Sequence, residues 1–425
     1  MLQLNFLREH TQEVIHRLEK RGNSNYKSLV EEAIELDKQK RDKQAETDGL
    51  LSELNKASKE IGMLMKSGDR KAADAAKAKI AEIKTSSQAM KQELTDLELR
   101  LHGVLTQIPN VPHALVPPGS TEDDNQVVET AGEIPVMSND SKPHWELADE
   151  YNLIDFQLGV KIAGAGFPVY RGKGAKLQRA LINFFLAEAE KSGYEEIIPP
   201  FLVNEDSGFG TGQLPDKEGQ MYHVTEDDLY LIPTAEVPIT NIYRDVILKA
   251  DELPQKLCGY SPCFRREAGS YGKDVRGLNR LHQFEKVEIV QICKPEESYG
   301  LLDEMISHVK GILGKLELPY RVLRLCGGDL SFASAITYDF EVYSAAQKRW
   351  LEVSSVSNFE TYQSNRLKCR FRGEEKKTAL VHTLNGSAMA LPRIMAALIE
   401  NNQTENGIVI PEAIQTFTGF DKIDK

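Results

Sequence analysis

The chain has 425 residues, a formal net charge of −12 at pH 7 and five cysteines. A chain of this length exceeds the size at which one hydrophobic core keeps growing, so we expect at least two domains. Because the balance of charge is acidic, the composition gives no global sign of nucleic-acid affinity, and we expect any contact with RNA to be local.

Cysteine usage and apolar stretches limit the class of protein further. The cysteines form no C-x-x-C pair, which disfavours both a disulfide framework and a cysteine-built zinc site, so no zinc is expected. The sequence has neither a secretory signal pattern nor an apolar stretch long enough to span a bilayer. We therefore expect a cytoplasmic protein with reduced thiols and no membrane partner.

Two heptad patterns occupy most of the first hundred residues. Apolar residues alternate in steps of three and four, as in a coiled-coil seam, over Leu29–Leu64 and again over Ala73–Val104. The segment KSGDR separates the two patterns, and its Gly68 and Asp69 favour a tight turn. We predict an antiparallel helical hairpin over about 27–104, about 54 Å long at about 1.5 Å per residue.

The predicted hairpin is electrically neutral, with 15 basic and 15 acidic residues between positions 27 and 100. It is therefore the part of this acidic chain that repels RNA least. Heptads alone more often mediate protein association, and alternating charges usually mark a solvated face. Lys40 and Lys43 stand at seam positions, where they either face RNA or extend to water.

A loop-like segment rich in Pro, Gly and acidic residues follows the hairpin and predicts a domain boundary. We divide the chain into an N-terminal domain at 1–110, a linker at 111–142 and a second domain at 143–425. In the second domain, strand and helix patterns mix without a regular repeat, which favours an α+β fold around an antiparallel sheet. No P-loop and no Rossmann glycine pattern is present, so ATP would need a different kind of site.

The segment FRREAGSYGKDVRGLNRLHQFEKVE, at 264–288, reads as a strand, a basic loop and a returning strand. Strand alternation predicts Arg265 and Glu267 on one face, and it places Phe284, Lys286 and Glu288 together on one face of the returning strand. The planar fork of arginine can grip two oxygens of a carboxylate or phosphate. The residues fit an anion-binding platform, although a solvated hairpin would show the same pattern.

Four other segments carry polar groups in defined settings. The first, at 180–203, reads as an apolar helix followed by a strand. In the second, Thr234 and Glu236 stand between two prolines that fix a loop, which suits an ammonium group. The third, RWLEVSSVSNFETYQSNR, offers Glu352 and Ser355 as hard oxygen ligands for Mg²⁺. Regular alternation separates those two side chains, so a bulge, a twist or a bridging water is required.

The fourth segment, HTLNGSAMALPRIMAALIENNQ, reads as a turn that opens an apolar helix. We place Asn385, Gly386 and Ser387 in the turn and Arg393 in the first part of the helix. A helix start directs free backbone N–H groups at whatever precedes it, which favours an anion there. Pro392 is tolerable in the first turn of such a helix.

These segments, in this order, resemble the signature motifs of class II aminoacyl-tRNA synthetases in the form of the bacterial seryl-tRNA synthetase family. The resemblance covers essentially the whole chain. It implies an N-terminal tRNA-binding hairpin followed by a catalytic domain built on an antiparallel sheet flanked by helices. It also implies ATP-dependent activation of L-serine to seryl-adenylate and transfer to the 3′ end of tRNA(Ser), with tRNA(Sec) as a second candidate acceptor.

The resemblance assigns roles to individual residues. Catalysis is assigned to Arg265, Glu288 and Arg393. Serine binding is assigned to Thr234, Ala235, Glu236, Arg265, Glu288, Asn385 and Ser387. ATP binding is assigned to Arg265, Arg266, Glu267, Phe284, Glu352, Val353, Ser354, Ser355 and Arg393. Mg²⁺, held with ATP, is assigned to Glu352 and Ser355.

The resemblance further implies a homodimer with tRNA bound across its subunits. The loop from Lys273 to Arg280 is a candidate contact for the acceptor end of tRNA. Two other functions stay open at this point. One is a synthetase-like ligase that loads an amino acid onto a carrier protein, although such relatives lack the long hairpin. The other is a non-catalytic RNA-binding paralogue that keeps the synthetase fold.

Overall fold

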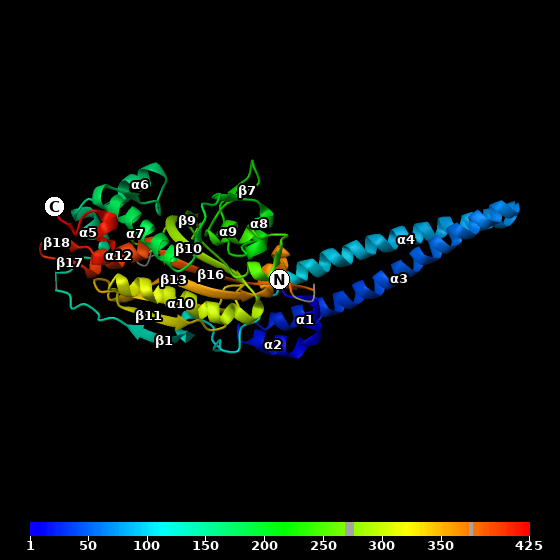
Figure 1. Ribbon diagram of the computed structural model, residues 1–425, viewed down its shortest axis with the longest axis horizontal. Helices are drawn as coiled ribbons and strands as arrows, with labels where there is room; N and C mark the ends of the chain where they lie inside the picture. Colours follow the sequence, from blue (N-terminus) through cyan, green and yellow to red (C-terminus); the bar gives the residue numbers. More distant parts are fainter. Residues whose placement is uncertain (139, 268–275, 374–376) are drawn as a thin grey trace. The chain divides into compact units, whose positions relative to one another are not determined.

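The computed structural model describes residues 1–138, 140–267, 276–373 and 377–425 (Figure 1). The chain forms two compact units. The helical unit consists of Leu2–Glu19 and Asn23–Pro109, and the sheet unit consists of Met1, Lys20–Gly22 and Asn110–Lys425. Lys273, at the start of the predicted acceptor-end contact, lies outside the described residues.

The helical unit contains the predicted hairpin. Its helices are α1 (Leu4–Glu9), α2 (Thr11–Glu19), α3 (Asn25–Ser67) and α4 (Arg70–Leu105). The long helices α3 and α4 run antiparallel side by side (Figure 1). Gly68 ends α3 in the left-handed conformation at φ 81°, and the side chain of Asp69 begins α4 by accepting a hydrogen bond from the Ala72 N–H at 3.0 Å. The predicted hairpin and its turn are confirmed.

The two lysines of the predicted seam connect the helices of the hairpin. Lys40 Nζ lies 2.9 Å from a carboxylate oxygen of Glu98, and Lys43 Nζ lies 3.0 Å from one of Glu93. Hydrogen bonds to Glu93 and Glu46 raise the pKa of the Lys43 ammonium. α4 thus supplies a carboxylate opposite each lysine. No rule of apolar spacing indicates that partner. That these lysines face RNA or extend to water stays a prediction.

The sheet unit is built on an eight-stranded sheet in the order β1-β11-β12-β13-β16-β10-β9-β4 (Figure 1). The strands, in that order, are β1 (Gln126–Ala131), β11 (Tyr320–Arg324), β12 (Ile336–Ser344), β13 (Arg349–Glu360), β16 (His382–Ala390), β10 (Gln283–Cys293), β9 (Gln255–Phe264) and β4 (Glu195–Glu196). Neighbouring strands pair antiparallel, except that the short β4 pairs parallel with β9. The predicted α+β fold with an antiparallel sheet is confirmed.

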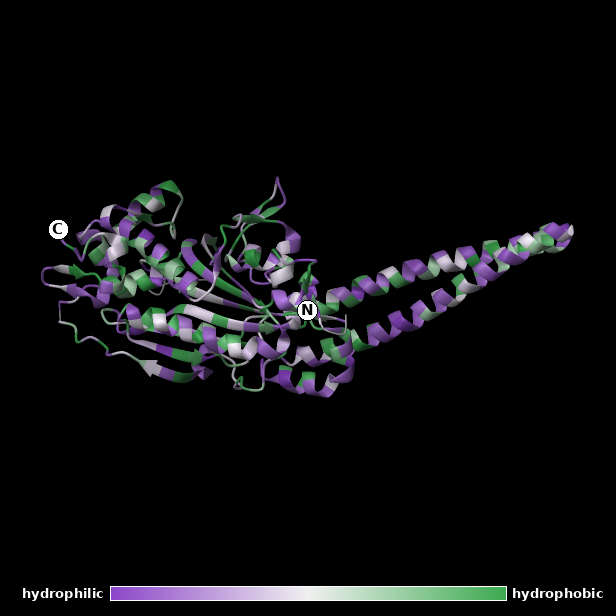
Figure 2. Ribbon diagram, in the orientation of Figure 1, coloured by the Kyte–Doolittle hydropathy of each residue, from purple (hydrophilic) through white to green (hydrophobic). Residues whose placement is uncertain are grey.

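Three helices cover one face of the sheet: α7 (Gly172–Lys191), α10 (Ser298–Lys315) and α12 (Leu391–Asn401). Their apolar side chains form one core cluster with alternate residues of the central strands, including Val287 and Ile289 of β10. Figure 2 shows hydrophobic residues concentrated in the central strands, whereas α3 and α4 carry long hydrophilic segments. Since alternate strand residues are used by the core, the others are left for the opposite face.

The remaining elements of the sheet unit are short. The helices are α5 (His144–Glu150), α6 (Phe156–Ile162), α8 (Glu205–Thr211), α9 (Glu236–Asn241), α11 (Thr361–Leu367) and α13 (Glu412–Thr418). The strands are β2 (Ile154–Asp155), β3 (Val169–Tyr170), β5 (Leu202–Val203), β6 (His223–Val224), β7 (Leu229–Leu231), β8 (Ile247–Lys249), β14 (Arg370–Arg372), β15 (Thr378–Leu380), β17 (Gln403–Thr404), β18 (Gly407–Val409) and β19 (Lys422–Ile423). Within the described ranges, no helix combines the length and the apolar character needed to cross a bilayer.

Candidate active site

Three neighbouring strands carry eight of the predicted site residues: β13 carries Glu352–Ser355, β16 carries Asn385 and Ser387, and β10 carries Phe284 and Glu288. Glu288 of β10 pairs directly with Ser387 of β16, and Gly386 pairs with Val356 of β13. On the face opposite α7, α10 and α12, the helix α9 packs against β9 and β10, where Val290 joins its apolar contacts. The sheet therefore gathers segments that are more than a hundred residues apart in the sequence.

The segment Asn385–Ser387 lies inside β16, so the predicted turn was wrong. β16 pairs with β10 on one side and with β13 on the other. A Cβ at Gly386 would lie 3.1 Å from both Met305 Cε and Val356 Cγ2. A larger residue would therefore be crowded here, in the middle of the sheet. The helix α12 begins only at Leu391.

Alternation also fails at the end of β9, which stops at Phe264. The Arg266 N–H bonds the Gln220 carbonyl at 2.9 Å, and Glu267 adopts φ 46°, so neither continues the sheet. The prediction that Arg265 and Glu267 share a strand face was therefore wrong. The Glu267 carboxylate instead lies 3.3 Å from Arg280 NH1.

Alternation holds along β10. Lys286 Nζ lies 2.6 Å from Glu288 Oε2, as expected of two side chains on one face. The guanidinium of Arg265 sits 5.3 Å from the centroid of the Phe284 ring, a cation–π distance. The Lys286–Glu288 and Arg265–Phe284 pairs both belong to the 264–288 segment, for which the sequence predicts an anion-binding platform.

A cluster of buried carboxyl and hydroxyl groups, called the acidic pocket below, lies where α9 meets β10. The Thr234 hydroxyl donates to Glu288 Oε2 at 3.2 Å, and Gln363 Nε2 donates to Glu236 Oε1 at 2.7 Å. Glu236 is 4% exposed and Glu288 is fully buried. Glu288 Oε1 has no hydrogen-bond partner among the described residues. Buried acceptors are normally satisfied, so this oxygen is a candidate for contact with a ligand.

Burial, followed by the neighbouring Glu288 charge, raises the pKa of the Glu236 carboxyl to about 7. An ammonium ligand favours the ionised carboxylate, so its affinity should fall as the pH drops below that pKa. If this pocket binds serine, as the resemblance implies, the KM for serine in amino-acid-dependent ATP–pyrophosphate exchange should rise about tenfold between about pH 8 and pH 6. Glu236→Gln should bind serine more weakly and should flatten this dependence. A serine KM that stays constant over the range would contradict an ammonium site at Glu236.

A β-bulge brings the two predicted magnesium ligands to one face. Asp339 of β12 pairs with Ser355, and Glu341 pairs with Glu352, so Val353 is the extra residue in β13. Asp339 and Glu341 share a face of β12, which places Ser355 and Glu352 together. The Ser355 hydroxyl donates to Asp339 Oδ1 at 2.6 Å. Burial and the Glu352 charge raise the pKa of Asp339 well above its usual range.

Arg393 connects this bulge to Asn279, in the loop that precedes β10. Its Nε donates to the Asn279 carbonyl at 3.1 Å, and its NH1 donates to the Glu352 carbonyl at 2.8 Å. Its NH1 also lies 3.4 Å from Glu352 Oε2. The guanidinium is thereby held beside the Glu352 carboxylate at the edge of the site.

Several of the predicted site residues make packing or hydrogen-bond contacts outside the acidic pocket. The Ala235 side chain packs among Ile239, Leu257 and Val290, and Val353 belongs to the main core. Ser354 donates its hydroxyl hydrogen to the Ser387 carbonyl across the sheet. The Arg266 guanidinium lies 5.9 Å from the Tyr222 ring.

Three residues without a predicted role line the site: Lys286, Gln363 and Asp339. Alternation with Phe284 and Glu288 could have given Lys286 a role. No local sequence pattern indicates Gln363 or Asp339. Gln363 reaches the site through the packing of α11, and Asp339 reaches it through the register of β12.

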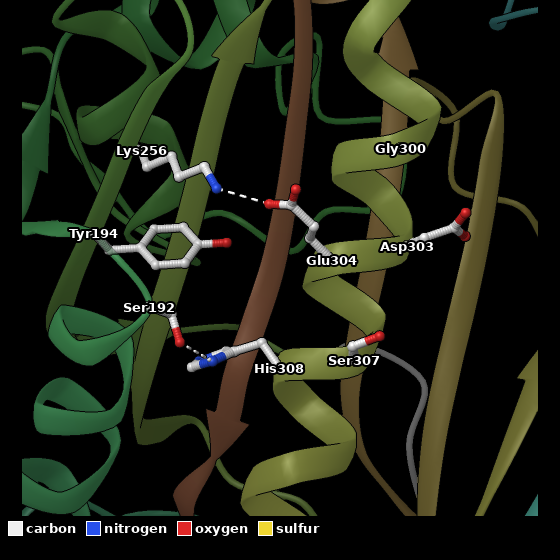
Figure 3. Close-up of a pocket in the computed structure, with 8 residues that line it drawn as sticks. All are labelled: Ser192, Tyr194, Lys256, Gly300, Asp303, Glu304, Ser307 and His308. Atoms are coloured by element: carbon white, nitrogen blue, oxygen red, sulfur yellow. Dashed lines mark hydrogen bonds and ion pairs between the residues drawn. The ribbon is translucent and has the colours of Figure 1, made fainter.

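A cavity of ≈ 540 Å³ lies apart from these residues, between the end of α7 and α10 (Figure 3). Ser192 Oγ lies 3.0 Å from His308 Nδ1, and Lys256 Nζ lies 2.7 Å from Glu304 Oε2. Burial lowers the pKa of His308 to about 4, so the ring is neutral near pH 7. The cavity shares no lining residue with the candidate site.

Comparison with known proteins identifies the family of the chain. Residues 221–402 match the model of the tRNA synthetase class II core domain (G, H, P, S and T), and residues 1–112 match that of the seryl-tRNA synthetase N-terminal domain. A serine–tRNA ligase of Salinibacter ruber is 51% identical over 425 residues, which cover 100% of this chain and 99% of that protein. The chain belongs to the seryl-tRNA synthetase family.

Solved structures agree with this family assignment. The seryl-tRNA synthetase of Pyrococcus horikoshii, solved with ATP, is 34% identical with a TM-score of 0.94, covering 100% of this chain and 99% of its own. The cytoplasmic serine–tRNA ligase of Naegleria fowleri, solved with AMP, is 28% identical with a TM-score of 0.88, covering 100% and 99%. The resemblance to the seryl-tRNA synthetase family is confirmed over the whole chain.

Proposed function

We propose that the protein is a serine–tRNA ligase, which activates L-serine with ATP and transfers the seryl group to the 3′ end of tRNA(Ser). The proposal is carried by the buried acidic pocket, set inside a chain that serine–tRNA ligases match from end to end. Its unpartnered Glu288 oxygen and the ionisable Glu236 suit the ammonium and hydroxyl groups of serine. tRNA(Sec) is a second candidate acceptor.

In the first step, the serine carboxylate attacks the α-phosphate of ATP and pyrophosphate leaves. No protein nucleophile is needed, so catalysis consists of positioning and of neutralising developing charge. We assign Arg265 to bridge the serine carboxylate and the α-phosphate. Phe284, whose ring lies beneath the Arg265 guanidinium, is assigned to stack on adenine, and Arg393 to bind the terminal phosphates. Arg266 and Glu267 complete the proposed ATP contacts.

Serine recognition is assigned to the acidic pocket. Glu236 would bind the ammonium, with Thr234, Ala235 and Asn385 around it. Glu288 would accept from the hydroxyl, the ammonium or both, and Ser387, its direct neighbour across the sheet, would lie beside the substrate side chain. Lys286 keeps one Glu288 oxygen occupied, so the other is available to the substrate.

The bulge in β13 fits the proposed binding of Mg²⁺ with ATP. It places Glu352 and Ser355 on one face, and both offer the hard oxygen atoms that Mg²⁺ prefers. Mg²⁺ bound there would neutralise negative charge on the ATP phosphates. Val353 and Ser354 hold β13 in the core and against β16, and so fix the position of the two ligands.

For the second step, we propose that residues 1–110 bind tRNA through the hairpin at 27–104, and that the linker at 111–142 leads to a catalytic domain at 143–425. We further propose a homodimer that binds tRNA across its subunits, and a cytoplasmic location. The match of residues 1–112 to the seryl-tRNA synthetase N-terminal domain argues against a ligase for carrier proteins. The presence of Arg265, Glu288, Glu352 and Arg393 argues against a non-catalytic paralogue.

Amino-acid-dependent ATP–pyrophosphate exchange tests the proposed activation step. Serine should give the highest kcat/KM. Alanine lacks the hydroxyl and would leave buried polar groups unpaired, so its kcat/KM should be about 10⁴-fold lower. Threonine must be excluded by size, which provides only about 10- to 200-fold discrimination. Absence of serine-dependent exchange, with total tRNA charging also absent, would refute the proposed function.

A further inference from the structure

A buried histidine–glutamate pair has no part in the proposed chemistry. His144, at the start of α5, and Glu400, near the end of α12, are both fully buried. His144 Nδ1 lies 2.7 Å from Glu400 Oε1, and the His144 backbone N–H donates to the same oxygen at 2.8 Å. A buried carboxylate is stable only where donors surround it.

Two further donors complete the surroundings of Glu400. They come from the end of β12 and the turn that follows it: the Ser344 hydroxyl donates to Oε2, and Gln347 Nε2 donates to Oε1 at 2.9 Å. The carboxylate therefore connects α5, α12 and that turn. Because these hydrogen bonds fix the Glu400 carboxylate, they also restrict the orientation of the His144 ring that bonds it.

The opposite side of the His144 ring contacts residues 276–279 of the 264–288 segment, which are called the loop end below. The Leu278 N–H donates to His144 Nε2 at 2.8 Å, so Nε2 carries no hydrogen and Nδ1–H donates to Glu400. A Cβ at Gly277 would lie 2.2 Å from Nε2, which shows how closely the loop approaches the ring. The next residue, Trp145, lies 4.8 Å from the Arg276 guanidinium. Two consecutive residues of α5 thus hold the loop end.

The loop end in turn holds Arg393. The Asn279 carbonyl accepts from Arg393 Nε at 3.1 Å, and Asn279 Nδ2 donates to Gln347 Oε1 at 3.1 Å. Because Gln347 also bonds Glu400, the hydrogen bonds form a closed circuit from Glu400 through His144 and the loop end to Gln347. Arg393 and Glu400 stand on the same helix, α12.

We propose that His144 and Glu400 are a positioning pair, which fixes the loop end and, through Asn279, the guanidinium of Arg393. The proposal rests on the assignment of Arg393 to the ATP phosphates. Disturbing the pair should therefore weaken ATP binding. Serine binding should not change, because none of the contacts of the pair includes Thr234, Glu236 or Glu288. A displacement of about 1 Å at a positioning group is enough to cost about 10²-fold in rate.

Two conservative substitutions separate the two bonds of His144. The amide of His144→Asn falls near Nδ1 and can still donate to Glu400, but it leaves the Leu278 N–H unbonded. The amide of His144→Gln reaches the position of Nε2 and can accept from Leu278. In pyrophosphate exchange we expect His144→Asn to raise the KM for ATP at least about tenfold, His144→Gln to raise it less, and the KM for serine to stay within about twofold.

Two additional measurements distinguish positioning from general destabilisation. In a Trp350→Phe background Trp145 is the single tryptophan, because the chain contains two, so its emission reports on the loop end. His144→Asn should change that emission and His144→Gln should change it less. His308→Asn, at the cavity apart from the site, is the matched control and should alter neither the emission nor the KM for ATP.

A double-mutant comparison with Arg393→Ala completes the test. If His144 acts through Arg393, His144→Asn should add less than about twofold to the KM for ATP in the Arg393→Ala protein. Full additivity of the two substitutions, or equal rises in the KM for ATP and serine, would overturn the proposal. An Arg393→Ala protein with unchanged KM for ATP would instead refute the assignment of Arg393 to ATP, a failure that is separate from that of the pair.

Discussion

Replacement of Arg265 with alanine should lower the kcat/KM of serine-dependent ATP–pyrophosphate exchange by about 10²- to 10³-fold. The proposed role of this guanidinium is to neutralise charge as the serine carboxylate attacks the α-phosphate. Removing one such preorganised donor typically costs this much in rate. The 5.3 Å contact with the Phe284 ring keeps the guanidinium over the platform before substrate arrives.

Arg265→Lys distinguishes charge from geometry. Lysine keeps the positive charge but lacks the planar fork that can contact two oxygens at once. We expect Arg265→Lys to remain at least about tenfold below the wild type, but to be more active than Arg265→Ala. The exchange rate at saturating ATP and serine is the measurement that separates the two variants.

Arg372→Ala is the matched control, since Arg372 is an exposed arginine on β14, a strand of a separate small sheet. Its exchange rate should equal that of the wild type. If Arg265→Ala retains wild-type exchange while its thermal stability is unchanged, the proposed bridge between serine and ATP does not exist.

Spacing in the sequence predicts correctly the structures that depend on near neighbours. The heptads and the glycine–aspartate pair predict α3, α4 and their turn, because both seam and turn are formed by residues close in sequence. Alternation likewise predicts the Lys286–Glu288 pair on β10. The same local rules indicated that a bulge, a twist or a bridging water must bring Glu352 and Ser355 together, and the register with β12 shows a bulge.

The errors arise where a distant strand decides the local structure. Asn385–Ser387 has the composition of a turn, but pairing with strands on both sides makes it the middle of β16. At Glu267, alternation predicts a strand where the backbone has already left the sheet. The hydrogen bonds of His144 connect residues that are 134 and 256 positions apart, so no local pattern could indicate them.

Shortening the hairpin should abolish tRNA charging while leaving serine activation intact. Deleting three heptads from each helix, residues 45–65 and 71–91, keeps the seam in register. It also keeps the Gly68–Asp69 turn and the Lys43–Glu93 pair, so the remaining hairpin still closes. The new order Asp69-Arg70-Gln92-Glu93 places a glutamate three residues after the cap, as in a capping box.

If the hairpin binds tRNA, the shortened protein should lose at least about 100-fold in the kcat/KM for charging of total tRNA, equivalent to about 2.7 kcal/mol of interaction. Serine-dependent pyrophosphate exchange in the same protein should stay within about twofold of the wild type, because the assigned activation residues all belong to the sheet unit. That exchange assay is the internal control for folding. Charging that survives the deletion would mean that tRNA is bound elsewhere. Parallel loss of charging and exchange would mean that the hairpin is needed for the stability of the sheet unit, and the loss of charging could then not be assigned to RNA binding.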